Sequence, residues 1–211
     1  MKHLYQKFKD RKHVNLDISN KCTLECIACS RQTNRFAGQP IPGVDTSLEQ
    51  FEKFCKYFSI ITMCGQISDP IFNPNLLKFI ELAKSYKKVL TIHTAATAKN
   101  KKMDWYEKAF RLGENFVHWK FGIDGLPDTS AIYRVNQDSD FLFDVMLRGK
   151  EIGAQVQWQY IIFKYNEHQI EEAKKIAKEK KLNIQFKKSS RFTGIEFALP
   201  NEDNYVRKQN Y

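Results

Sequence analysis

The chain has 211 residues, 42% of them hydrophobic, and a formal net charge of +10 at pH 7. This length suits one domain with a sizeable core, and the composition excludes an intrinsically disordered or collagen-like chain. No apolar run approaches the roughly 20 residues that cross a membrane, and the N-terminus lacks the apolar stretch of a signal peptide, so we expect a cytoplasmic protein.

The positive charge has two interpretations. Lysines scattered over helix exteriors and turns indicate a solvated basic surface. The alternative is an anionic substrate or a nucleic acid. No basic patch interleaved with aromatic residues is present in the sequence, so a nucleic-acid partner is not expected, whereas an anionic metabolite stays open.

Three of the five cysteines follow the first predicted strand, residues 13–18, in which apolar and polar residues alternate. Cys22, Cys26 and Cys29 form a C-x3-C-x2-C array. A cubic iron–sulfur cluster normally takes four protein thiolates, so three thiolates would leave one iron open to another ligand.

The same cysteines permit other interpretations. They also suit a zinc site with His13 or Cys64 as a remote fourth ligand, or thiols that bind no metal. Three cysteines placed so close together suit a reducing compartment and a metal better than a disulfide framework.

A polar loop is predicted over residues 30–46, and a helix follows it. Thr46 and Glu49 form a capping-box pattern that predicts the start of this helix. Apolar residues continue at helical spacing, and Cys55 among them is predicted to be a small buried residue.

Five further strands are predicted from runs rich in β-branched and aromatic residues. They span 59–63, 88–94, 116–125, 155–163 and 182–186. Amphipathic helices alternate with them: one carries Leu76 to Ala83, others span 103–112 and 141–152, and the last is capped by Asn166 with Gln169 as its partner. This alternation predicts parallel βαβ units, and about 30 residues per unit fit six units rather than eight.

Polar residues gather where these strands end, which is the edge that carries the chemistry of α/β barrels. The second strand leads into Gly65, Gln66, Ser68 and Asp69; the fourth leads into Asp124, with Arg134 beyond it; the sixth is followed by Arg191. His93, inside the third strand, is interpreted as a core or lining residue rather than a catalytic one.

The cysteine array resembles the signature of the radical SAM superfamily. The Gly65–Pro70 turn resembles the family's G-G-E-P turn, with Gln66 in place of the second glycine and Asp69 in place of the glutamate. The stretch from Gly122 to Arg134 resembles the S-I-D-G…Y-R pattern, with glycine in place of the serine.

The resemblance covers roughly residues 13–192. It implies an α/β fold, a partial (β/α)6 TIM-like barrel of the radical SAM type, close to the barrel domain of SPASM and Twitch proteins. The chain is then one domain over 1–211, with a short polar tail at 193–211 that holds no cysteine for an auxiliary cluster.

The resemblance also implies the cofactors and their ligands. Cys22, Cys26 and Cys29 would hold a [4Fe-4S] cluster whose open iron binds S-adenosyl-L-methionine (SAM). Reductive cleavage of SAM would then give a 5′-deoxyadenosyl radical that abstracts hydrogen from a substrate. The SAM contacts would come from Gly65, Gln66, Ser68, Asp69, Asp124 and Arg134, and Arg191 would meet SAM or substrate.

Several partners follow from the resemblance. An external low-potential donor of the flavodoxin or ferredoxin type would supply the electron. A peptide or protein side chain is the favoured substrate, and a nucleotide or other anionic metabolite is the alternative. The wide mouth of a short barrel leaves room for a partner that closes it. A SAM- and cluster-binding protein without turnover and a zinc-stabilised binding module also stay open, the former because the turns at Gln66, Ser68 and Ala95 depart from the family pattern.

Overall fold

The structure is a computed structural model that describes residues 12–188. In these residues six parallel strands form one sheet in chain order, from β1 to β6. The strands are β1 His13–Leu16, β2 Ile60–Cys64, β3 Val89–Thr94, β4 Val117–Gly122, β5 Gln155–Ile162 and β6 Asn183–Lys188. All six predicted strands are therefore confirmed.

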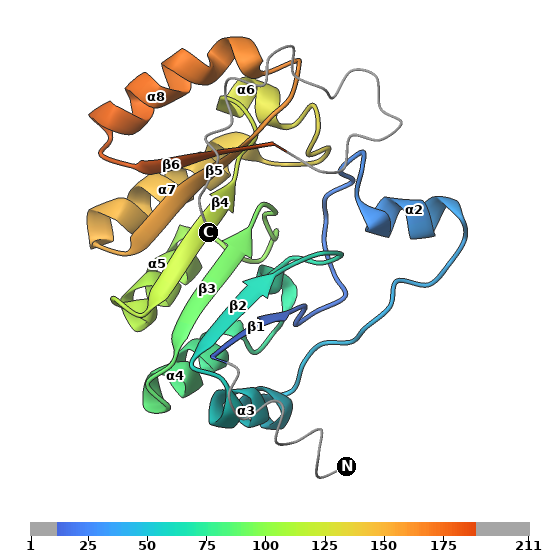
Figure 1. Cartoon of the computed structure of the whole chain (residues 1–211), viewed down its shortest axis with the longest axis vertical. Helices are drawn as coiled ribbons and strands as arrows, with labels where there is room; N and C mark the ends of the chain where they lie inside the picture. The colour runs from blue at the N-terminus through green and yellow to red at the C-terminus, as the bar shows by residue number, and fades with distance from the viewer. Residues whose placement is uncertain (1–11, 189–211) are drawn as a thin grey trace.

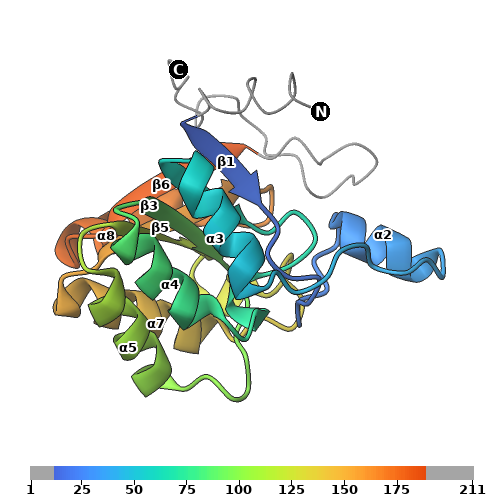
Figure 2. The same cartoon turned by 90° about the horizontal axis from the view of Figure 1, so that it is seen from below.

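Helices connect the strands, and most of them cover one face of the sheet (Figures 1 and 2). They are α2 Ser30–Phe36, α3 Leu48–Tyr57, α4 Leu76–Ser85, α5 Met103–Gly113, α6 Pro127–Ser130, α7 Ser139–Ile152 and α8 Ile170–Glu179, with 3-10 turns η1 Pro70–Phe72 and η2 Glu167–Gln169. The fold is a partial TIM-like barrel, as expected. No described helix is both long and apolar enough to cross a membrane.

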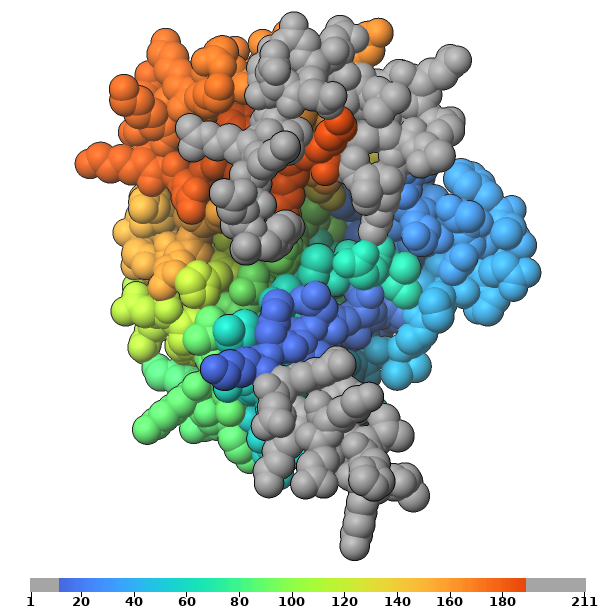
Figure 3. Space-filling view, in the orientation of Figure 1, coloured from blue at the N-terminus to red at the C-terminus, as the bar shows by residue number. Residues whose placement is uncertain are grey.

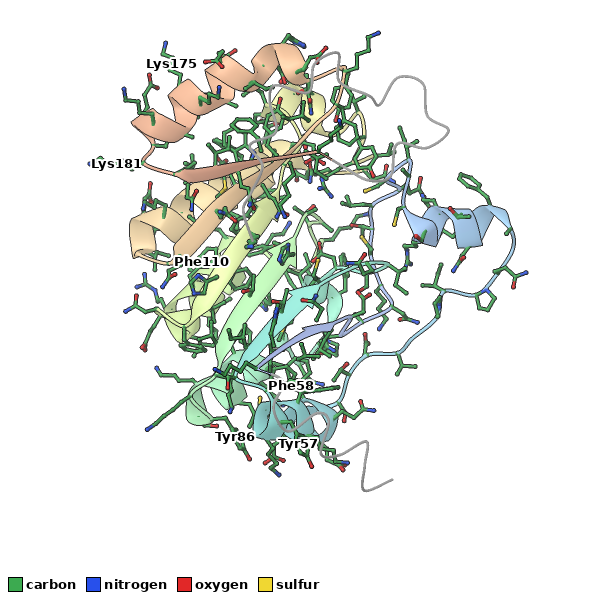
Figure 4. All side chains as sticks on the ribbon, viewed as in Figure 1. Tyr57, Phe58, Tyr86, Phe110, Lys175 and Lys181 are labelled. Atoms are coloured by element: carbon green, nitrogen blue, oxygen red, sulfur yellow. The ribbon has the colours of Figure 1, made fainter. Side chains whose placement is uncertain are left out.

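The core lies between the sheet and these helices. Phe110 on α5, labelled in Figure 4, is 1% exposed and packs edge-on against Trp119, with ring centroids 5.3 Å apart. Phe121, two residues along β4, lies on the same face and is fully buried. Each such side chain contributes about 2–3 kcal/mol through burial.

The side chains on the opposite face of these strands are mostly polar. His93 on β3 pairs in register with Lys120 on β4, and Lys120 pairs with Gln157 on β5. Because side chains of a strand alternate between faces, these residues lie on the face opposite Trp119. The inner face of the barrel is thus built for polar contacts rather than for packing.

The start of α3 differs from the prediction by one residue. Ser47, not Thr46, is the N-cap: its hydroxyl accepts from the Gln50 amide, and the Gln50 side chain accepts from the Ser47 amide. Thr46 is held elsewhere, because its own amide donates to the Ile18 carbonyl at 2.9 Å. Cys55 on this helix is fully buried, as predicted.

Helix α2 lies in the segment predicted to be a loop. Its N-cap, Cys29, makes no side-chain capping bond, so the sequence lacks the Ser, Thr, Asp or Asn signal that predicts a helix start. This helix projects away from the sheet (Figures 1 and 2) and, with residues 37–46, forms the light-blue lobe of Figure 3.

Candidate active site

A cavity of ≈340 Å³ opens where the strands end, and it gathers residues from distant parts of the chain. This volume is within the range of about 300–1,000 Å³ typical of small-molecule sites. Eight of the predicted site residues line it: Cys22, Cys26, Cys29, Gly65, Gln66, Ser68, Asp69 and Arg134. Asp124 does not line it, and Arg191 lies outside the described residues.

The loop that carries the cysteines is fixed by backbone hydrogen bonds to two other turns. The Asp69 amide donates to the Lys21 carbonyl at 2.9 Å, and the Glu25 amide donates to the Val135 carbonyl at 3.0 Å. The cysteine loop is thereby joined to the turn after β2 and to the segment that carries Arg134.

The three cysteines of this loop are partly buried, and two of them have an arginine nearby. Burial raises the pKa of Cys22 to about 12, with a further rise from Asp69, whereas Arg31 lowers it. Burial also raises the pKa of Cys26, and Arg134 opposes this rise. Metal binding requires thiolates and therefore releases protons; the two guanidinium groups favour the thiolate form.

The turn after β2 can form only with glycine at position 65. A side-chain β-carbon there would lie 1.6 Å from the Ser68 carbonyl oxygen. Asp17, directly after β1, holds the same turn by accepting from the Gln66 amide at 3.0 Å and from the Ser68 hydroxyl at 2.8 Å. Asp17 was not among the predicted site residues, because a single acidic residue after a strand gives no distinct signal.

Asp69 ties the β2 turn to the β3 turn. Its Oδ2 accepts from the Thr94 hydroxyl at 3.1 Å and from the amides of Ala95 and Ala96 at 2.8 and 2.9 Å. Its Oδ1 accepts from the Ile71 amide at 3.2 Å. Only 4% of the residue is exposed. Four protein donors thus occupy the carboxylate that the resemblance assigns to SAM contact, and this carboxylate holds two turns together.

Asp124, which the resemblance assigns to SAM contact, is fully buried. Its Oδ1 accepts from the Ile161 amide at 2.8 Å, and its Oδ2 lies 2.7 Å from Arg134 Nε. The approach of Oδ2 and Nε is that of an ion pair rather than of a directed hydrogen bond. Asp124 therefore acts on the cavity through Arg134, which it holds in place.

The glycine at position 122, which replaces the serine of the S-I-D-G pattern, has a structural reason. A β-carbon at this position would lie 2.8 Å from Arg134 Nη2 and 3.2 Å from the Ala95 side chain. The guanidinium group thus occupies the space that the serine of the family pattern would take. Small residues at 122 and 95 make room for it.

Two residues predicted to cap the last helix instead support the Asp124 turn. The Asn166 amide group donates to the Asp124 carbonyl at 2.9 Å, and the Gln169 side chain accepts from the Leu126 amide at 3.1 Å. A 3-10 turn separates Asn166 from α8, and neither residue caps that helix through its side chain. The pattern predicted the helix but not the partners of these side chains.

The cavity also contains residues that sequence reasoning did not assign to it, among them Arg31, Lys120, Gln159 and Lys187. His93 and Cys64 line it as well, the former as predicted. The sequence pattern that could have identified them is the polar residue at every second position of β4, β5 and β6. In a barrel these residues face inward, whereas in an open sheet they would face solvent.

Metal-binding chemistry rests on the three thiols of one loop. Among residues 12–188, no three His, Cys, Asp or Glu side chains are close enough to hold a single metal ion. One zinc ion would bring its thiolates to within about 4 Å of one another, since a Zn–S bond is about 2.3 Å. A cubic cluster offers each thiolate its own iron. Soft thiol donors on one wall of a cavity fit such a cluster.

Comparison with known proteins by sequence gives no match, either to a protein family or to a curated protein. Comparison of the fold does. SuiB of Streptococcus suis bound to S-adenosylmethionine superposes with a TM-score of 0.71 at 14% identity, over 95% of this chain and 47% of that one.

Two other structures are similar to the chain. The anSMEcpe structure with bound AdoMet gives a TM-score of 0.64 at 14% identity, over 94% of this chain and 54% of that one. Methylornithine synthase (PylB) gives 0.62 at 15% identity, over 92% and 58%. The chain spans about half the length of these proteins. The chain shares its fold with the matched part of these three structures.

Proposed function

We propose that this chain is a radical SAM enzyme. Cys22, Cys26 and Cys29 would hold a [4Fe-4S] cluster, and SAM would bind beside it in the same cavity. The chemistry that such a cluster would supply is one electron for the cleavage of SAM into methionine and a 5′-deoxyadenosyl radical, which would abstract hydrogen from the substrate. A flavodoxin- or ferredoxin-type donor would provide that electron.

The observation that carries the proposal is the convergence of separate motifs on one cavity. The three cysteines, the Gly65–Asp69 turn and Arg134 come from different βα units, yet all line it. Bound S-adenosylmethionine in SuiB and bound AdoMet in anSMEcpe support SAM as the ligand.

The residues divide the work of binding. Arg134 would fork onto the SAM carboxylate, since a planar guanidinium group matches a carboxylate with two parallel hydrogen bonds. The backbone of the Gly65–Ser68 turn would receive the SAM amino group, because Asp69 is already occupied by its four donors. Asp124 and Asp17 would hold these binding groups in position.

A peptide or protein side chain is the substrate we favour. Two of the structures that match this chain are peptide complexes: SuiB bound to the precursor peptide SuiA, and anSMEcpe bound to AdoMet and the Cp18Cys peptide. A nucleotide or other anionic metabolite is the alternative that the positive charge of the chain supports. Of the two fourth ligands considered for a zinc module, His13 bonds Thr62 at 2.8 Å and does not line the cavity, whereas Cys64 lines it and keeps this alternative open.

Iron and sulfide analysis tests the cluster directly. We expect the anaerobically reconstituted chain to hold about four irons and four sulfides per chain, with the absorbance of a cluster. Cys26→Ala should lose most of this iron. Cys55→Ala is the matched control, because it removes a fully buried thiol of α3 that is not part of the cavity. Zinc in place of iron, or full iron in Cys26→Ala, would refute the ligand assignment.

A further inference from the structure

Two of the lysines that line the cavity have no negatively charged partner among residues 12–188. Lys120 lies on β4 and Lys187 on β6. Within residues 12–188 neither ammonium group forms an ion pair or a hydrogen bond. Asp69 is the single acidic residue among those that line the cavity in this part of the chain, and four donors already occupy its carboxylate.

These lysines act on the same neighbouring side chain. Burial, then Lys120, then Lys187 lower the pKa of His93 to about 4. Burial and Lys120 also lower the pKa of the Lys187 ammonium group. The two ammonium groups and the imidazole therefore lie close together, and the cluster they form has donors but no acidic acceptor.

A side-chain amide completes this cluster. Gln159 on β5 lines the cavity and hydrogen-bonds to His93. Its Nε2 is buried and has no hydrogen-bond partner within the described residues. A buried donor without a partner costs free energy, and so do two like charges brought together out of water. A bound anion would offset both costs.

The lysine cluster is separate from the cysteine loop, although the Cys64 thiol of the same cavity raises the pKa of Lys187 against the larger effect of burial. The cations that act on the thiols are Arg31, on Cys22, and Arg134, on Cys26. Arg134 also has its own counter-charge in Asp124. The cavity thus has an arginine end beside the cysteine loop and a lysine end on the inner faces of β4 to β6.

We propose that Lys120 and Lys187, with the amide of Gln159, bind an anionic group of the substrate, either a carboxylate or a phosphate. This inference rests on the proposed function in that it assigns the group to the substrate of the same cavity. Charge-assisted hydrogen bonds from two ammonium groups would fix that end of the substrate. The remainder would extend toward the cysteine loop, where hydrogen is abstracted.

Calorimetric titration with two simple probes tests the site. The full reconstituted chain, saturated with SAM, is titrated with glycerol 3-phosphate and with N-acetylglutamate, and glycerol serves as the neutral control. We expect one or both anions to bind and glycerol not to bind. Preference for the first probe indicates a phosphate group in the substrate, and preference for the second a carboxylate.

Variants locate the binding. In the double variant Lys120→Gln, Lys187→Gln the affinity for the anion should fall by about tenfold or more, because both charge-assisted contacts are lost. Lys175→Gln, Lys181→Gln is the matched control: it removes the same charge from an exposed position on α8 and from the turn that follows it, far from the cysteine loop (Figure 4). Its affinity should stay within about twofold of that of the unaltered chain.

Three results would overturn the proposal. The first is that the unaltered chain binds neither anion. The second is that the two double variants bind the anion equally well. The third is that SAM competes with the anion, which would mean that the lysines bind the carboxylate of SAM itself. Repeating the titration without cluster or SAM separates the two proposals. Anion binding that needs Lys120 and Lys187 in a chain that assembles no cluster would refute the proposed function and leave the anion site intact.

Discussion

The residues of the site fall into two groups: those that line the cavity and could contact a ligand, and those behind them that hold the lining side chains in place. Arg134 belongs to the first group and Asp124 to the second, and their ion pair is buried. Removing one partner of such a pair leaves an uncompensated charge, which costs more than the pair itself contributes. The supporting residues are therefore expected to affect stability and ligand affinity together.

Asp124→Asn is expected to lower the free energy of unfolding by about 3–5 kcal/mol, because Arg134 loses its counter-charge in a buried place. It should also weaken SAM binding. Urea unfolding and SAM titration measure the two effects. Asp128→Asn, an exposed acid in the same turn, is the control and should change stability by less than about 0.5 kcal/mol. Equal behaviour of both variants would show that Arg134 does not depend on Asp124.

His93 should make stability depend on pH. Its pKa is lowered from 6.5 to about 4 in the folded chain. Between these values the unfolded chain binds more protons than the folded one, so this contribution to stability is lost as pH falls from about 7 toward 4. The loss is at most about 3 kcal/mol.

Comparing the pH dependence of urea unfolding in the unaltered chain and in His93→Gln isolates this effect. The variant should lose less stability between pH 7 and pH 4, by at most about 3 kcal/mol. His118→Gln is the control, since it removes an imidazole from the neighbouring strand without changing the cavity lining. Parallel curves for the unaltered chain and His93→Gln would contradict the prediction.

At the scale of elements, the turns after the strands hold one another. Asp17 after β1 binds the β2 turn, and Asp69 of that turn binds the β3 turn. Asn166 after β5 binds the turn after β4. The turns after β2, β3 and β4 are thus each fixed by a polar side chain from a neighbouring unit, which gives this part of the barrel edge a defined shape.

Gly65→Ala should disrupt the β2 turn. The added β-carbon would meet a backbone oxygen at 1.6 Å, so the turn itself must shift. We expect a loss of about 3 kcal/mol in urea unfolding, at the upper end of overpacking costs. Gly38→Ala is the control: its β-carbon meets nothing within 4 Å, and its φ of +64° alone costs about 1 kcal/mol. Similar losses in both variants would argue against the steric role of position 65.

Sequence patterns predicted the elements better than their ends. All six strands and the helices α3, α4, α5, α7 and α8 were expected from their periodicity, because a buried face imposes it. The caps at Thr46 and Asn166 were wrong: the Thr46 backbone amide donates to the Ile18 carbonyl, and the Asn166 side chain donates to the Asp124 carbonyl. Helix α2 has no capping side chain at Cys29, and the residues it buries, Arg31 and Gln32, are polar, so no apolar periodicity marks it.

At the scale of the whole molecule, the parallel order of the six strands brings their C-terminal ends to one edge. That is why residues as distant as Cys22, Asp69 and Arg134 line one cavity. Strand order made this convergence predictable. The burial of Asp124 and the inward direction of Lys120 and Lys187 were not predictable, because they depend on which face of each strand the barrel encloses.

Formation of 5′-deoxyadenosine is the measurement that bears most directly on the proposed chemistry. The anaerobically reconstituted chain, given dithionite and SAM, should release 5′-deoxyadenosine, and Cys26→Ala should not, whereas Cys55→Ala should retain this activity. A chain that holds a four-iron cluster and binds SAM, yet forms no 5′-deoxyadenosine with dithionite even when the anion that fits the lysine cluster is present, would contradict the assignment of radical chemistry.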